Sequence, residues 1–297
     1  MRRLAAAALA LAAGVAQAGS PPRGCDRSHD LTATQQDRLL RFTALVREAL
    51  AGSGAEAALI SRSGTDLSRF GLRYSHAAIA VAAGFDDAPG MPWAVRQLYY
   101  ACAEGAPRLF DQGLAGFVSG SDDADIGFVS VLLLPPEAAA PLAAAARDKA
   151  LALALLNARY SANAYPFATT FQNCNQWVAE LLAAATAGPR TREDAQAWLR
   201  REGYAPVPVH ASPWLMLAGR FVPWLHFADH PDEQLNAGEV QTSLPDSLEA
   251  FARARWPAAR RLEFCHGPAG LLSRDDGQPL ADGCRPRPGD RLTPLSS

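Results

Sequence analysis

Lysine is almost absent from this 297-residue chain, and Lys149 is the single example. The 28 basic and 30 acidic residues give a formal net charge of −2 at pH 7. A near-neutral chain lacks the excess of basic charge that nucleic-acid binding needs, so we expect no nucleic-acid partner. No C-x-x-C motif occurs, which argues against a redox protein. Beyond the N-terminus, no apolar run approaches the ~20 residues that cross a bilayer.

Residues 1–18 have the three parts of a secretory signal. Two arginines follow Met1, residues 4–15 are apolar, and the sequence AQA at 16–18 fits a cleavage site. We predict cleavage after Ala18 and an exported mature chain, periplasmic or extracellular, with no transmembrane segment. The alternative is a membrane anchor, which the short apolar run disfavours because a span takes ~20 residues.

The chain has five cysteines, an odd number for an exported protein, in which cysteines tend to pair. Cys265 and Cys284 are close in sequence and flank a turn-rich segment, so we predict a disulfide between them. Cys25 and Cys102 form a second candidate pair. This count leaves Cys174 over as a possible reactive thiol, although connectivity does not follow from sequence alone.

Hydrophobic periodicity predicts an α+β fold in which an antiparallel sheet packs against helices. Helical spacing predicts helices over residues 35–50, 136–158, 175–187, 192–202 and 243–255. Apolar runs bounded by Gly, Asp and Pro predict strands within residues 58–64, 71–84, 93–105, 125–135 and 260–267. The Pro- and Asp-rich segment after the last strand is predicted to be irregular.

The character of the sequence changes at residue 190, beyond which prolines, tryptophans and short elements dominate. We predict a signal peptide over 1–18, an α+β core over 19–190 and a C-terminal extension over 191–297 that packs on the core. No oligomeric state follows from these patterns.

Two short motifs combine into a candidate thiol-catalytic site. In NCNQW, Cys174 begins a helix, whose N–H groups and positive dipole end stabilise a thiolate or an oxyanion. In YSHAAIAV, His76 begins a strand, where an imidazole can act as base and then as acid. We expect the neighbours of both residues to bind substrate, namely Tyr74, Ser75, Asn173 and Asn175.

The strand after His76 supplies the candidate for a third catalytic residue. Alternation places Trp93, Val95, Gln97 and Tyr99 on one face of this strand. We therefore predict Gln97 as the third residue, and because an amide cannot take a proton, its role would be only to orient the His76 ring. Tyr99 is the reserve, and a one-residue slip in register would reverse the face.

These motifs, in this order, resemble the circularly permuted papain-like fold, in which the histidine precedes the cysteine. That group includes permuted relatives of NlpC-type cell-wall hydrolases and the lecithin:retinol acyltransferase family. His76 and Cys174 match its two motif positions, and Gln97 falls where relatives often carry Glu, His or another polar residue. Ala77 departs from the valine that often follows the histidine. The longer strings GLRYSHAAIAV, LYYACAEG, LFDQGLAGF and FQNCNQWVAELLAAA are also similar to the bacterial domain of unknown function 2145.

The resemblance implies an exported cysteine-dependent hydrolase or acyltransferase that works through an acyl-enzyme. Its substrates would be amide bonds of cell-wall peptides or lipid acyl groups, and no cofactor is implied. The alternative is a non-catalytic exported binding or structural module on the same scaffold. A metal site at His226 and His230 is disfavoured, because they flank a loop without enough convergent ligands.

Overall fold

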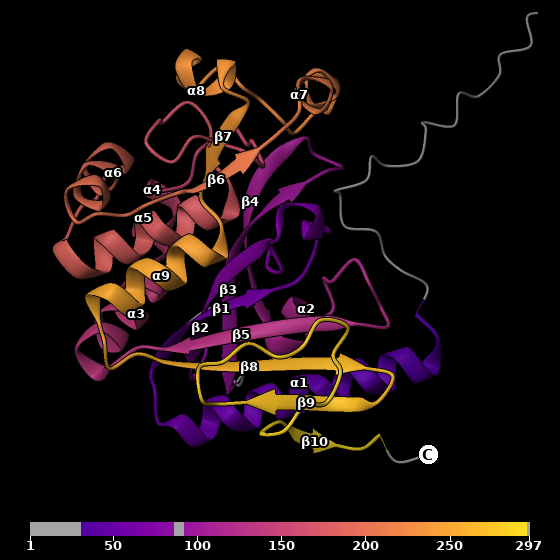
Figure 1. The fold of residues 1–297 in the computed structure, drawn as a ribbon. Helices are drawn as coiled ribbons and strands as arrows, with labels where there is room; N and C mark the ends of the chain where they lie inside the picture. Colours follow the sequence, from indigo (N-terminus) through magenta and orange to yellow (C-terminus); the bar gives the residue numbers. More distant parts are fainter. Residues whose placement is uncertain (1–30, 86–91, 296–297) are drawn as a thin grey trace, which may run out of the picture.

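The computed structural model describes residues 31–85 and 92–295 (Figure 1). Within this part of the chain, eight strands form one antiparallel sheet in the order β10-β9-β8-β5-β1-β2-β3-β4. Their bounds are β1 (Ala57–Arg62), β2 (His76–Ala82), β3 (Trp93–Ala101), β4 (Ala106–Gly113), β5 (Gly127–Leu133), β8 (Arg260–Gly267), β9 (Gly270–Arg274) and β10 (Arg291–Thr293). A two-stranded sheet pairs β6 (Val207–His210) with β7 (Glu239–Thr242).

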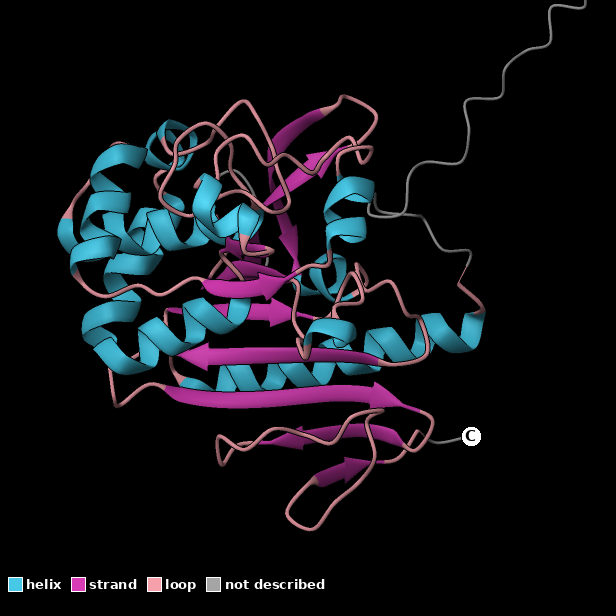
Figure 2. Cartoon of the chain, turned by 45° about the horizontal axis from the view of Figure 1, so that its top comes forward, coloured by secondary structure: helices cyan, strands magenta, loops and turns pink. Residues whose placement is uncertain are grey.

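Helices cover both faces of the large sheet, which confirms the predicted α+β class (Figure 2). The helices are α1 (Ala33–Ser53), α2 (Leu114–Val118), α3 (Pro136–Arg147), α4 (Lys149–Ala154), α5 (Cys174–Ala187), α6 (Arg192–Arg201), α7 (Pro213–Gly219), α8 (Asp232–Asn236) and α9 (Pro245–Arg255), with a 3-10 turn η1 (Ser68–Phe70). One face packs against α3 and α5, and the other packs against α1 and α2.

The strand alternation divides most of the core into two large apolar clusters, one on each face, and a third, smaller cluster surrounds the Cys265–Cys284 disulfide. In β1, Leu59 packs into the cluster under α5, whereas its neighbour Ile60 packs into the cluster under α1. In β2, Ile79 and Ala80 divide in the same way. Because both faces are covered, these central strands read as continuous apolar runs rather than as alternating ones.

Part of the chain beyond residue 190 joins the same sheet as the preceding residues. The strand predicted over 260–267 is β8, which pairs directly with β5. The prediction of an irregular C-terminal segment was wrong in part, because β9 and β10 continue the sheet beyond β8. The predicted boundary at residue 190 falls between α5 and α6.

Two further differences have local causes. The helix predicted over 136–158 is divided into α3 and α4, because Asp148 ends the first and caps the second by accepting from Leu151 N–H at 2.9 Å. The edge strand β4 was not predicted. Its residues are mostly half-exposed and mixed in polarity, so they lack the apolar run that marks the central strands.

The predicted disulfide between Cys265 and Cys284 is confirmed. Cys102 is also disulfide-bonded, and its predicted partner Cys25 lies outside the described residues, as does the predicted signal peptide over 1–18. Cys174 is free and buried. In the described part of the chain, no helix combines the length and apolar character that crossing a membrane requires.

Candidate active site

The N-terminus of α5 reaches the sheet where β2 and β3 separate. These strands pair from Ile79 opposite Arg96 to Ala82 opposite Trp93, and residues 97–101 of β3 pair with β4. The start of β2 is therefore open on the side of β3, and it is within reach of the first turn of α5.

Asn175 joins this first turn to the start of β2. Its Oδ1 accepts from Ala77 N–H at 2.8 Å, and its Nδ2 donates to Ser75 O at 3.2 Å. One buried amide thus contacts the residues on both sides of His76. Because Asn175 directly follows Cys174, these bonds fix the backbone of His76 next to the start of the helix.

Asn173 caps α5 with its side chain, as expected for a residue just before a helix. Its Oδ1 accepts from Gln176 N–H at 2.7 Å. Its Nδ2 donates to Ala162 O, Thr242 Oγ1 and Ser243 O at 2.9–3.1 Å. Both polar atoms of the amide are therefore used to fix the helix start.

His76 and Gln97 form a buried hydrogen bond. His76 Nε2 donates to Gln97 Oε1 at 2.5 Å, because a carboxamide oxygen can only accept. This fixes the tautomer and leaves the lone pair on Nδ1. The Tyr99 ring lies 5.2 Å from the His76 ring between centroids, so both candidates for the third position contact the histidine.

Cys174 is the first residue of α5, and its side chain is 6 % exposed. Burial raises the pKa of the thiol to about 11, while the nearby Arg62 charge and the N–H groups of Asn175 and Ala77 lower it. The first N–H groups of a helix have no acceptor within the helix. Here the N–H of Gln176 is capped by Asn173 Oδ1, and the N–H groups of Cys174 and Asn175 act on the Cys174 sulfur.

Burial also lowers the pKa of His76 to about 3, an effect that the Arg62 charge reinforces and the hydrogen bond to Gln97 opposes. Among the described side chains, no hydrogen bond joins Cys174 to His76. The resting pair is therefore a neutral thiol and a neutral imidazole. The imidazole is unprotonated, as a general base must be, but its pKa of about 3 lies well below the neutral range in which a general base is most efficient.

Cys174 and His76 line one pocket with a volume of about 420 Å³. Two of the four residues predicted to bind substrate, Ser75 and Asn175, also line it. The two other predicted substrate-binding residues do not: Asn173 is used as the helix cap, and Tyr74 is buried with its hydroxyl donating to Glu263. Sequence reasoning therefore placed two of four neighbours in the pocket wall.

Two of the pocket residues that were not predicted from the sequence are polar groups that act on the Cys174 thiol. Arg62 ends β1 and is 3 % exposed, and the available signal was a charged residue in an otherwise apolar strand. Tyr160 lies beside the thiol: burial and the neighbouring Cys174 raise the pKa of its hydroxyl well above the usual value. Nothing in the loop sequence around Tyr160 distinguishes it from the other tyrosines of the chain.

A profile described as an uncharacterized protein conserved in bacteria (DUF2145) matches residues 49–252. The chain belongs to the DUF2145 family. The match contains both His76 and Cys174, together with every pocket element from β1 to β7. No curated protein and no solved structure is significantly similar to this DUF2145 chain.

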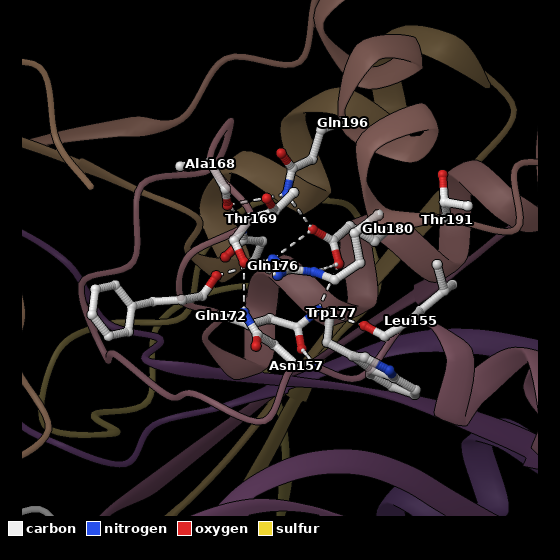
Figure 3. A network of polar contacts seen from close by, with 12 residues as sticks. Leu155, Asn157, Ala168, Thr169, Gln172, Gln176, Trp177, Glu180, Thr191 and Gln196 are labelled. Atoms are coloured by element: carbon white, nitrogen blue, oxygen red, sulfur yellow. Dashed lines mark hydrogen bonds and ion pairs between the residues drawn. The ribbon is translucent and has the colours of Figure 1, made fainter. Parts of the chain in front are cut away.

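A buried polar network holds α5 of this DUF2145 chain in place. Figure 3 shows Gln172 and Gln196 directed toward Glu180, to which they donate at 2.6 and 2.7 Å. Arg192 donates to the same carboxylate at 2.9 Å and to Phe171 O at 3.0 Å. The network connects α5, α6 and the loop that leads to Cys174.

We expect iodoacetamide to alkylate Cys174 slowly at neutral pH, with a rate that rises toward a midpoint near the thiol pKa of about 11. The reason is that only the thiolate reacts, and burial keeps the thiol protonated. The rate at each pH is measured by mass spectrometry of the alkylated peptide. A midpoint below that of an ordinary cysteine, about 8.5, contradicts this electrostatic description of the site.

Proposed function

We propose that this DUF2145 chain is a cysteine-dependent hydrolase or acyltransferase that acts on ester or amide bonds through an acyl-enzyme. The observation that carries the proposal is the pairing of a free thiol at a helix start with a histidine in the same pocket wall. Asn175 supports it further, because its amide bridges the helix start and the strand start.

In the proposed reaction, His76 Nδ1 accepts the thiol proton as Cys174 Sγ attacks the carbonyl carbon. The carbonyl oxygen becomes an oxyanion, which the first N–H groups of α5 stabilise. The imidazolium, held by Gln97, then donates its proton to the leaving nitrogen or oxygen. This leaves a thioester on Cys174, which water or another acceptor attacks with His76 again as the base.

The order of the elements supports a circularly permuted papain-like core. His76 on β2 precedes Cys174 on α5 in the chain, and α5 packs against β2 and β3. In this interpretation Gln97 on β3 is the residue that orients the imidazole. Replacing Gln97 by alanine should therefore lower kcat more than it raises KM, and an unchanged kcat would remove this role.

Export belongs to the same proposal. The Cys265–Cys284 disulfide supports it, since disulfides persist in oxidising compartments. The mature chain should then begin at Gly19 and be found outside the cytoplasm. N-terminal sequencing of the protein from cell fractions tests this, and a cytoplasmic chain that keeps residues 1–18 would refute it.

The proposed role of His76 predicts that His76→Ala lowers the hydrolysis of p-nitrophenyl esters by about 10²–10⁴-fold, the usual contribution of a general base. Added imidazole should restore part of the rate, because it can enter the space that the side chain leaves. The matched control is His210→Ala, which alters an exposed strand residue. An unchanged rate in His76→Ala would exclude the proposed mechanism.

A further inference from the structure

Arg62 is a buried cation without a carboxylate partner among the described residues. Its guanidinium donates to the Gly120 and Ser63 carbonyl oxygens and, at 3.1 Å, to the Tyr99 hydroxyl. Its Nε is buried and has no hydrogen-bond partner. All the groups that contact it through hydrogen bonds are thus neutral.

The other buried arginines behave differently. Arg96 is paired with Asp111 at 2.5 Å, and Arg192 is paired with Glu180 at 2.9 Å. A buried charge is costly unless an opposite charge compensates it. The fold satisfies this requirement at Arg96 and Arg192 but not at Arg62, which leaves a place for an anion from outside the chain.

The uncompensated charge faces the candidate active site. Arg62 lines the same pocket as Cys174 and His76, and it donates to the hydroxyl of Tyr99, whose ring lies 5.2 Å from the His76 ring. The two other charged residues of the pocket wall, Arg69 and Asp122, are exposed. An anionic group bound at Arg62 would therefore lie beside the reacting thiol.

Much of the remaining pocket wall is apolar. Leu215 and Met216 of α7 line it together with Val222, Trp224 and Phe227. The apolar character continues onto the surface beside α7, where Trp214 is 79 % exposed and Phe221 is 81 % exposed. This part of the wall fits an alkyl chain, whereas the polar side chains of the pocket, such as Ser75, Asn163 and Thr242, lie outside α7 and residues 222–227.

We propose that the pocket binds an anionic amphiphile, with its carboxylate or phosphate on Arg62 and its alkyl chain along the apolar wall formed by α7 and residues 222–227. Binding of this kind does not depend on catalysis. The further statement that the substrate is an anionic lipid-type acyl compound, and not a cell-wall peptide, rests on the proposed function.

The test uses a full-length Cys174→Ala chain, in which no acyl transfer can occur, and measures binding by calorimetry and tryptophan fluorescence. The probes are dodecanoate, dodecyl phosphate, dodecanol, acetate and inorganic phosphate, each below its aggregation concentration. We expect both anionic amphiphiles to bind at least about tenfold more tightly than dodecanol, which corresponds to the discrimination of one charge-assisted contact. Acetate and phosphate lack the chain and should bind more weakly still.

Substitutions then assign the charge preference to one residue. Arg62→Met should remove the preference for anionic amphiphiles over dodecanol, whereas Arg69→Met, at the exposed rim, should keep this preference. Arg62→Lys serves as the second variant if Arg62→Met does not fold, and it should retain part of the preference. The stronger of the two anionic probes indicates whether the natural anion is a carboxylate or a phosphate.

The proposal is overturned if dodecanol binds as tightly as dodecanoate, or if the preference for the anion survives in Arg62→Met. It fails separately from the proposed function. Ester turnover by the wild-type chain without any charge preference would reject only the anionic amphiphile. Selective binding by Cys174→Ala without turnover by the wild-type chain would reject only the catalytic proposal, and would favour the binding module.

Discussion

Replacing Cys174 by alanine is expected to lower the turnover of p-nitrophenyl esters by about 10⁶-fold, the order of loss that follows removal of the catalytic nucleophile in a serine protease. The expectation follows from the position of the free thiol at the start of α5, in the same pocket as His76. Steady-state rates are measured at saturating ester, with the enzyme concentration determined by amino-acid analysis. The ratio of the wild-type rate to the Cys174→Ala rate gives the loss directly.

The control for this experiment is a measurement showing that the Cys174→Ala chain is still folded. The thiol is small and makes no side-chain hydrogen bond that the helix start needs, since Asn173 and Asn175 supply those contacts. Cys174→Ala should therefore keep a thermal transition close to that of the wild-type chain. Cys174→Ser, which keeps the size but offers a poorer nucleophile, should lose most of the rate as well. A Cys174→Ala chain that is folded and still active would contradict the assignment of the nucleophile.

Replacing Arg192 by methionine is expected to lower the free energy of unfolding by about 3–5 kcal/mol, the cost of removing one partner of a buried ion pair. The Arg192–Glu180 pair is almost completely buried, and burial alone raises the pKa of Glu180. Without the arginine, the Glu180 carboxylate keeps the two glutamine donors but loses its counter-charge. Urea unfolding followed by circular dichroism measures the change.

Arg190→Met is the matched control. Arg190 lies two residues before Arg192 and forms an exposed ion pair with Asp148. Surface pairs of this kind contribute about 0–1 kcal/mol. The double variant Arg192→Met/Glu180→Gln should recover part of the loss, since it removes the buried negative charge. Equal losses in Arg190→Met and Arg192→Met would show that the buried network does not stabilise α5 in the way that its contacts suggest.

The central strands and α5 could be predicted because their signals are local. β1, β2 and β5 are short apolar runs bounded by turn residues, and α5 has an asparagine cap before it and Gly188 after it. The alternation in β3 was also sufficient to place Gln97 and Tyr99 on the face that reaches His76. These features depend on neighbouring residues of the sequence.

The rest of the site depends on contacts between distant residues, which no local pattern contains. Asn173 looked like a substrate contact because it flanks Cys174, but its amide caps α5 and binds backbone groups of Ala162 and Ser243. The unpaired state of Arg62 depends on the absence of a carboxylate from every described element around it. Only the assembled fold reveals which charged residues have partners and which do not.

The pKa values of Cys174 and His76 distinguish the proposed mechanism from one in which the two residues form a thiolate–imidazolium pair before substrate binds. In the resting site, burial favours the neutral forms of Cys174 and His76. The thiol must therefore lose its proton to His76 during the attack on the carbonyl, and not before it. Slow alkylation by iodoacetamide together with rapid acylation by an ester would be the combined signature of this mechanism.

Trapping the acyl-enzyme tests the central claim most directly. The chain is mixed with p-nitrophenyl dodecanoate, quenched with acid within one turnover, digested and analysed by mass spectrometry. We predict a dodecanoyl group on the peptide that contains Cys174, released by hydroxylamine as a thioester is, and strongly reduced in His76→Ala. Ester hydrolysis by the wild-type chain with no acyl group on Cys174, or with the group on another residue, would contradict the account.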